Sequence, residues 1–107
     1  MTFRDAFLTA QVAMGLTHYH VTFRERQDGN YATTEADPEN CIATVYHDPE
    51  RCRVDNVTEA TAAHECLHLA LADLIHALEG NSRLAQVEEE RAVRRLENIA
   101  TRGIFGA

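Results

Sequence analysis

The residues best suited to chemistry in this sequence are His64, Glu65 and His68, which form an H-E-x-x-H motif. Residues four apart in a helix lie above one another on one face, so the two histidines can present imidazole nitrogens to one tetrahedral zinc ion. Glu65 lies about 100° around the helix from His64, where it can take a proton from a water that the ion activates. The motif therefore predicts a zinc site with its own general base.

The motif lies inside a segment whose apolar residues recur at helical spacing. These residues are Ala62, Ala63, Cys66, Leu67, Ala70, Leu71, Leu74, Ile75 and Leu78. Asn56 followed by Glu59 resembles a capping box and Gly80 supplies a stop, so a helix is predicted from Thr58 to Leu78. The apolar surface is wide, which predicts a central, largely buried helix, where two imidazoles without a partner would be costly. The alternative is that both histidines lie at a polar edge of the core.

A catalytic zinc ion usually takes a third protein ligand, and the next predicted helix offers Glu88, Glu89 and Glu90. The apolar stripe of that helix comprises Leu84, Ala85, Ala92, Val93, Leu96, Ile99 and Ala100. At 100° per residue, Glu89 lies about 30° from the centre of this stripe, Glu88 about 70° and Glu90 about 130°. A carboxylate so close to the stripe needs a cation. Glu89 is therefore the predicted third ligand, Glu88 is the alternative, and Glu90 is expected to be solvated.

The remaining elements must position this helix pair, and their patterns predict one more helix and three strands. The helix runs from Thr2 to Leu16, and the strands are the alternating segment Tyr19 to Phe23, the segment Tyr31 to Thr34 after the turn signal Asp28-Gly29-Asn30, and Cys41 to Tyr46. A loop through Cys52 leads to the zinc helix, and a helix from Arg83 to about Arg102 folds back antiparallel after Gly80-Asn81-Ser82. The predicted fold is α+β, in the order α-β-β-β-α-α, with helices packed on a small three-stranded sheet.

Composition limits the classes of protein to consider. With 107 residues, 45% hydrophobic and 25% charged, the chain is expected to be one globular domain spanning residues 1–107. The net charge of −7 and the lack of a basic run disfavour a nucleic-acid surface, and the arginines at 91, 94, 95 and 102 are expected on a solvated helix face. Three cysteines make no even disulfide framework, and no apolar stretch approaches a membrane span. These features predict a cytoplasmic protein with reduced thiols.

Two segments resemble a known group of enzymes. The run Ala62 to Leu71, which reads A-A-H-E-C-L-H-L-A-L, resembles the active-site helix of minimal gluzincin metallopeptidases of phages and bacteria, related to the SprT-like and ImmA/IrrE-like groups. The run Glu89 to Val93 is similar to their downstream E-x-x-A segment. The resemblance covers nearly the whole chain, although only H-E-x-x-H is specific. It implies a zincin-like fold and a peptidase in which His64, His68 and Glu89 hold zinc.

The chain also departs from these groups. It has no Cys₄ zinc ribbon, which SprT-like proteins often carry, and no repressor-type DNA-binding module of the kind that accompanies ImmA-like proteins. Larger gluzincins add a Tyr or His that stabilises the oxyanion, and no spacing here identifies that residue. Tyr46, His47 and His76 are the candidates.

Together these observations predict a zinc-dependent metallopeptidase that acts on a peptide or protein, with Glu65 as general base. An extended substrate is expected to pair with the strand Cys41 to Tyr46 at the edge of the sheet. The rival hypothesis is a catalytically weak or inactive, zinc-stabilised protein-interaction module, which the acidic surface and small core favour. A hydrolase of a nonpeptide bond is a third alternative. Neither a nucleic acid nor a membrane is expected as a partner.

Overall fold

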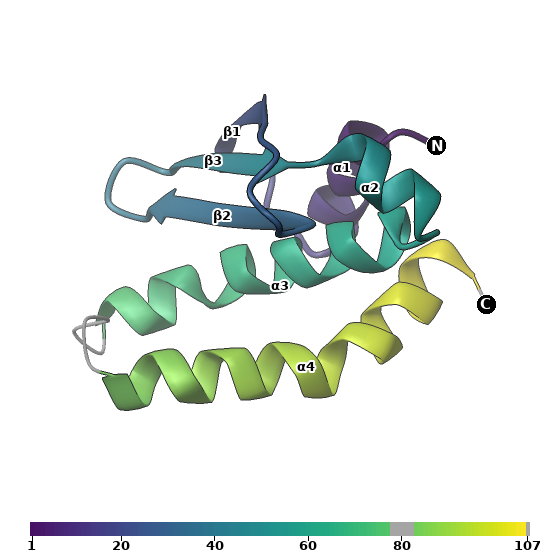
Figure 1. The fold of residues 1–107 in the computed structure, drawn as a ribbon. Helices are drawn as coiled ribbons and strands as arrows, with labels where there is room; N and C mark the ends of the chain where they lie inside the picture. The colour runs from purple at the N-terminus through teal and green to yellow at the C-terminus, as the bar shows by residue number, and fades with distance from the viewer. Residues whose placement is uncertain (78–82, 107) are drawn as a thin grey trace.

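The computed structural model describes residues 1–77 and 83–106, and within these residues the fold is α+β. The elements are α1 (Phe3–Ala13), β1 (His20–Glu25), β2 (Ala32–Asp37), β3 (Ile42–His47), α2 (Pro49–Val54), α3 (Thr58–Ala77) and α4 (Arg83–Phe105). The predicted order is confirmed, with one short helix, α2, added before the motif helix. Leu78 and the connection Gly80-Asn81-Ser82 lie outside the described residues. In Figure 1, α3 runs between the sheet and α4.

The three strands form a mixed sheet in the order β1-β3-β2. β3 is therefore central: it pairs parallel with β1 and antiparallel with β2. The turn signal after β1 does not return the chain beside β1, because residues 26–31 cross the end of β3 before β2 begins. The expectation that a substrate pairs with the strand Cys41 to Tyr46 is wrong, since both edges of that strand are already occupied. The edge strand that packs against α3 is β2.

The backbone N–H and C=O groups of successive residues in β2 point alternately toward β3 and toward the free edge of the sheet. The Tyr31 carbonyl accepts a hydrogen bond from the Asp48 N–H at 2.9 Å, so Tyr31 points its backbone toward β3. Hydrogen-bonding direction alternates along an antiparallel strand, and the N–H and C=O groups of Ala32 and Thr34 therefore face away from β3. The side chain of Thr34 points toward α3 at the same position.

The added helix α2 explains why the predicted capping box does not form at Asn56. Asn56 adopts a left-handed φ of 56° and its N–H donates to the Arg53 carbonyl at 3.2 Å. The Val57 N–H reaches back to the Cys52 carbonyl at 2.9 Å, which completes a Schellman ending of α2. Asn56 thus ends one helix just before α3 begins, and Cys52 is buried in α2 rather than lying in a loop.

The core lies between α1, the first half of α3 and the inner face of the sheet. Phe3 and Phe7 of α1 place their rings 6.5 and 5.3 Å from that of Phe23 on β1. The Cys66 thiol of α3 donates a hydrogen bond to the Phe7 carbonyl, which links α1 to the motif helix. Further along α3 the burial decreases, and Leu74 is exposed. Among the described residues, no helix is long and apolar enough to cross a membrane.

The packing of α1 on this core predicts a large loss of stability when its central ring is removed. Phe7 is fully buried, so Phe7→Ala leaves a cavity and is expected to lower the free energy of unfolding by about 3–5 kcal/mol. Val12 lies on the same helix with 67% of its surface exposed. Val12→Ala is expected to change the free energy of unfolding by less than about 0.5 kcal/mol. Urea unfolding monitored by circular dichroism measures both. Equal effects of the two variants would contradict this account of the core.

Candidate metal centre and its cleft

Two histidines of α3 and one glutamate of α4 bring their side-chain atoms together. The Nε2 atoms of His64 and His68 lie 3.2 Å apart. The Glu90 carboxylate completes the group, with Oε2 at 3.1 Å from His68 Nε2 and Oε1 at 3.5 Å from His64 Nε2. This His-His-Glu group is an arrangement that could hold a metal ion.

The separations within the group match those of a tetrahedral site. Ligands placed at about 2.0–2.1 Å from a zinc ion, at tetrahedral angles, lie about 3.3 Å from one another. The two Nε2 atoms, at 3.2 Å, are close to this value, and each lies at a similar distance, 3.1 or 3.5 Å, from a different oxygen of the Glu90 carboxylate. These three side chains could therefore hold a cation between them.

Carboxylates from α4 hold the outer nitrogen of each imidazole. His64 Nδ1 lies 2.6 Å from Glu97 Oε2, and His68 Nδ1 lies 2.9 Å from Glu89 Oε2. An ionised carboxylate only accepts hydrogen bonds, so each Nδ1 carries the proton and donates it. In the neutral imidazole this leaves each Nε2 with a free lone pair, directed at the other ring and at Glu90. Metal-binding histidines commonly have a carboxylate or carbonyl on their other nitrogen in this way.

This hydrogen-bond pattern gives the centre the chemical character that a cation could use. Two nitrogen lone pairs and one carboxylate converge within 4.8 Å, and all of them are acceptors. Acceptors at these separations repel one another unless a metal ion or added protons lie between them. Arg94 supplies only part of the positive charge that would offset this repulsion. Its Nε is 3.5 Å from Glu90 Oε1, and its side chain is 73% exposed.

Glu65 extends from the same helix toward β2, beside the metal centre. Its side chain is buried, and its Oε1 accepts a hydrogen bond from the Thr34 hydroxyl at 2.8 Å. Burial raises the pKa of Glu65, while the Thr34 hydroxyl and the imidazoles of His68 and His64 act in the opposite direction. A buried carboxylate whose pKa is raised is well suited to accept and return a proton.

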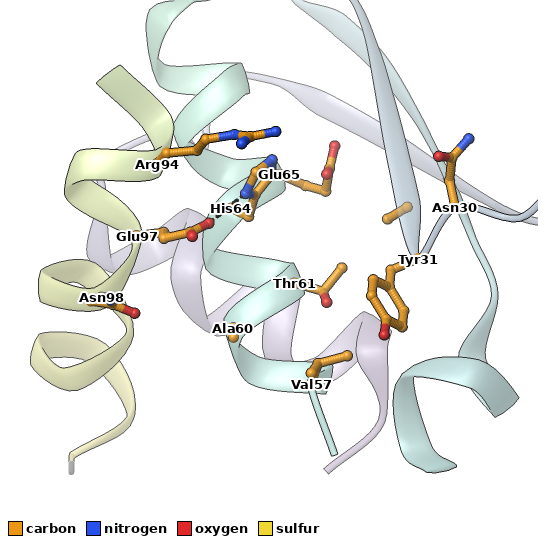
Figure 2. A pocket seen from close by; sticks show the side chains of 11 residues that line it. Asn30, Tyr31, Val57, Ala60, Thr61, His64, Glu65, Arg94, Glu97 and Asn98 are labelled. Atoms are coloured by element: carbon orange, nitrogen blue, oxygen red, sulfur yellow. Dashed lines mark hydrogen bonds and ion pairs between the residues drawn. The ribbon is translucent and has the colours of Figure 1, made fainter. Parts of the chain in front are cut away.

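The centre opens into a cleft between β2 on one side and α4 on the other. One cavity of about 380 Å³ contains His64, His68, Glu65 and Glu90 against Thr33 and Thr34 of β2. A second cavity of about 610 Å³ shares His64 and Glu65 and continues along α3 past Thr61 to Val57. Figure 2 shows this second part, with Tyr31 and Asn30 forming the wall opposite Glu97 and Asn98. The last two residues of the crossing segment, Asn30 and Tyr31, thus form one side of the cleft.

The structure brings together His64, Glu65 and His68, as the motif predicts, and it places Glu90 rather than Glu89 against the two Nε2 atoms. Glu89 contacts the outer nitrogen of His68, and Glu90 occupies the position facing both Nε2 atoms. Glu88, the alternative, is exposed and pairs with Arg91 at 3.0 Å. Glu90 is 41% exposed and pairs with Arg94 at 3.5 Å, as expected of a partly solvated glutamate, but its carboxylate also faces the two histidines. This second contact was not predicted, because the face of α4 that meets α3 is rotated from the predicted stripe.

The predicted face of α4 differs from the observed one because two apolar residues that were used to predict it are exposed. Leu96 and Ile99, which weighted the predicted stripe, are 44% and 70% exposed. The face that meets α3 instead carries the fully buried Val93, with Glu90 and Glu97 beside it. The role of Glu97 was not predicted, although its spacing of seven residues from Glu90 places both on one helix face and could have indicated it.

The three candidates for an oxyanion-stabilising residue lie away from both cavities. Tyr46 points from the outer face of the sheet, where its ring stacks under Arg26. His47 is buried beside Phe3, with ring centroids 4.6 Å apart, and burial lowers its pKa. His76 is exposed and lies 3.2 Å from Glu39.

Comparisons with protein-family models, with curated proteins and with solved structures found no match for this chain. What is established is therefore the architecture and the site: a small α+β protein with a His64/His68/Glu90 group on two packed helices. This arrangement is consistent with a zincin centre.

The two neighbouring glutamates are expected to affect metal binding differently. Glu90→Gln removes an acceptor that faces both Nε2 atoms, whereas Glu89→Gln only weakens the hold on the His68 ring, which typically costs about 10- to 100-fold in affinity. We expect Glu90→Gln to weaken zinc binding more than Glu89→Gln does, and Glu88→Gln to leave it unchanged. Competition with a chromophoric chelator measures the three affinities. The reverse order for Glu89 and Glu90 would restore Glu89 as the ligand.

Proposed function

We propose that this protein is a zinc-dependent metallopeptidase whose centre is held by His64, His68 and Glu90. The observation that carries the proposal is the position of Glu65: a buried carboxylate lies in the same cleft as the three converging acceptors, between them and an edge strand. A metal that only joined two helices would need no such carboxylate beside it. When bound, zinc would polarise a carbonyl and lower the pKa of a water molecule to about 7.

The donor set supports zinc as the ion. Two imidazole nitrogens and one carboxylate match the His₂Glu set of catalytic zinc sites, which leave a fourth position open. His64 and His68 are partly exposed toward the cleft, with 25% and 18% of their side-chain surface accessible, so this position faces solvent rather than the core. Glu97 and Glu89 would keep both rings oriented for the ion.

An extended peptide fits the cleft because one wall is the free edge of β2. The backbone groups of Ala32 and Thr34 face that edge, where a peptide could add as a further strand. Its side chains would alternate between the cleft and solvent. The continuation past Thr61 to Val57 and Tyr31 provides space for one substrate side chain in a cavity of mixed polar and apolar lining.

Glu65 would then carry the proton through the reaction. In its ionised form it accepts a proton from the attacking water, while the Thr34 hydroxyl keeps the carboxylate oriented. It returns this proton to the amine nitrogen as the peptide bond breaks. Its burial excludes bulk water from the transfer.

Removing the proton acceptor tests this role. Glu65→Gln keeps the size and the hydrogen-bonding reach of the side chain, so zinc content is expected to remain at one equivalent while kcat falls about 10²- to 10⁴-fold. Hydrolysis of a library of internally quenched peptides measures activity, and elemental analysis measures zinc. Full activity in the variant would exclude Glu65 as the base. A wild type that binds zinc, is stabilised by it and cleaves no peptide would instead favour the zinc-stabilised interaction module.

The contact from β2 predicts a shift in the pH dependence. The Thr34 hydroxyl donates to the ionised form of Glu65 and so lowers its pKa. Thr34→Val removes the donor, which raises the pKa, and the base then becomes ionised only at higher pH. The acid limb of the kcat/KM profile is expected to move to higher pH. Thr33→Val, on the outward-facing neighbour, is the matched control, and an unchanged acid limb in Thr34→Val would contradict the assignment.

A further inference from the structure

The cleft contains one cation among otherwise acidic and neutral groups. Of the described residues that line the two cavities, Arg94 is the only lysine or arginine, whereas Glu65, Glu89, Glu90 and Glu97 are all acidic. Arg94 lies on α4 between Glu90 and Glu97. Figure 2 shows its side chain extending from α4 past His64 toward Glu65.

The contacts of Arg94 leave most of its donors available. Among the described residues its ion-pair partner is Glu90, through Nε at 3.5 Å, and no contact involves its terminal nitrogens. A guanidinium remains charged at any working pH and presents five N–H donors in a planar fork. Since Glu90 Oε1 is itself 3.5 Å from His64 Nε2, these donors stand beside the three converging acceptors.

On the basis of the proposed function, we propose that Arg94 is a catalytic residue that stabilises the oxyanion formed during peptide hydrolysis. The juxtaposition required for this role is present: Arg94 and Glu65 both line the larger cavity, and His64 lies between them. Tyr46, His47 and His76 are all absent from that cavity. Arg94 therefore supplies the donor that the sequence patterns do not identify.

The step that Arg94 would assist balances without any further reactant. A water oxygen forms a bond to the peptide carbonyl carbon, its proton passes to Glu65, and the electron pair of the carbonyl π bond moves onto the oxygen. Arg94 donates hydrogen bonds to this oxyanion, where negative charge develops only as the reaction proceeds. When the C–N bond breaks, the pair returns to the carbonyl, and Glu65 gives its proton to the leaving amine.

The exposure of Arg94 sets the size of the expected effect. A buried oxyanion donor contributes about 10²- to 10³-fold to kcat, and a side chain that is 73% exposed before substrate binds should contribute less. We expect Arg94→Gln to lower kcat about 10- to 100-fold with little change in KM, and Arg94→Lys to recover part of the loss. Arg91→Gln breaks a comparable pair on the same helix, with Glu88, and is the matched control.

The test combines kinetics with a binding measurement. Zinc-loaded wild type, Arg94→Gln, Arg94→Lys and Arg91→Gln are compared on one quenched peptide, made with a free and with an amidated C-terminus. Affinity for a phosphinic peptide, which mimics the tetrahedral oxyanion, is measured by calorimetry, and zinc content and the melting temperature of the zinc-free protein are recorded. The expected result is a parallel loss of kcat and phosphinic affinity in Arg94→Gln, on both peptides, with zinc content and melting temperature unchanged.

Two results would overturn the assignment while leaving the peptidase intact. Arg94→Gln that retains wild-type kcat and phosphinic affinity shows that the guanidinium does not meet the oxyanion. A rise in KM confined to the peptide with the free C-terminus shows that Arg94 binds a substrate carboxylate instead. An inactive wild type is a different failure, because it rejects the proposed function itself.

Discussion

The arrangement of this protein depends on three acceptors that point at one another. His64 Nε2, His68 Nε2 and the Glu90 carboxylate lie 3.1–3.5 Å apart, while Glu97 and Glu89 fix the proton of each ring on the opposite nitrogen. The carboxylates that orient the rings thereby prevent the facing nitrogens from acting as donors unless the rings gain a second proton. A cation at the centre satisfies all three acceptors at once. The same geometry that makes the site suitable for a metal makes it electrostatically unfavourable without one.

The attachment of α4 follows from this constraint. Among the α4 residues whose side chains are described, Val93 is the only one fully buried, and much of the face toward α3 consists of Glu89, Glu90 and Glu97. Burial of apolar surface therefore contributes less to this helix pair than to the α1–α3 pair, where Phe3, Phe7 and Cys66 are enclosed. A cation between the helices would add to the fold as well as to the chemistry, since binding to the folded state alone increases stability.

The sequence predicted the elements well but not which glutamate of α4 faces the two histidines, for different reasons. The motif helix was predictable because its histidines and its apolar pattern agree on one period, and both lie on the same element. To predict the candidate ligand on α4, the rotation of this second helix about its axis must be known to within less than half a turn. Leu96 and Ile99 biased this estimate because exposed apolar residues are common on protein surfaces and cannot be recognised from one sequence. The added helix α2 was missed because its Asn56 ending looks like the start of α3.

The order of the strands in the sheet cannot be predicted from local sequence patterns, yet it determines which strand edge borders the cleft. Three similar strands can be ordered in several ways, and alternation alone does not say which becomes central. Here β3 is central, and the crossing segment 26–31 carries β2 to the edge beside α3. Thr34 then has two roles at one position: its hydroxyl holds Glu65, and its backbone faces the free edge. A peptide strand that paired with this edge would lie beside Glu65, whose carboxylate the same residue, Thr34, holds. Substrate alignment and proton transfer would thus be coupled through a single position of the edge strand.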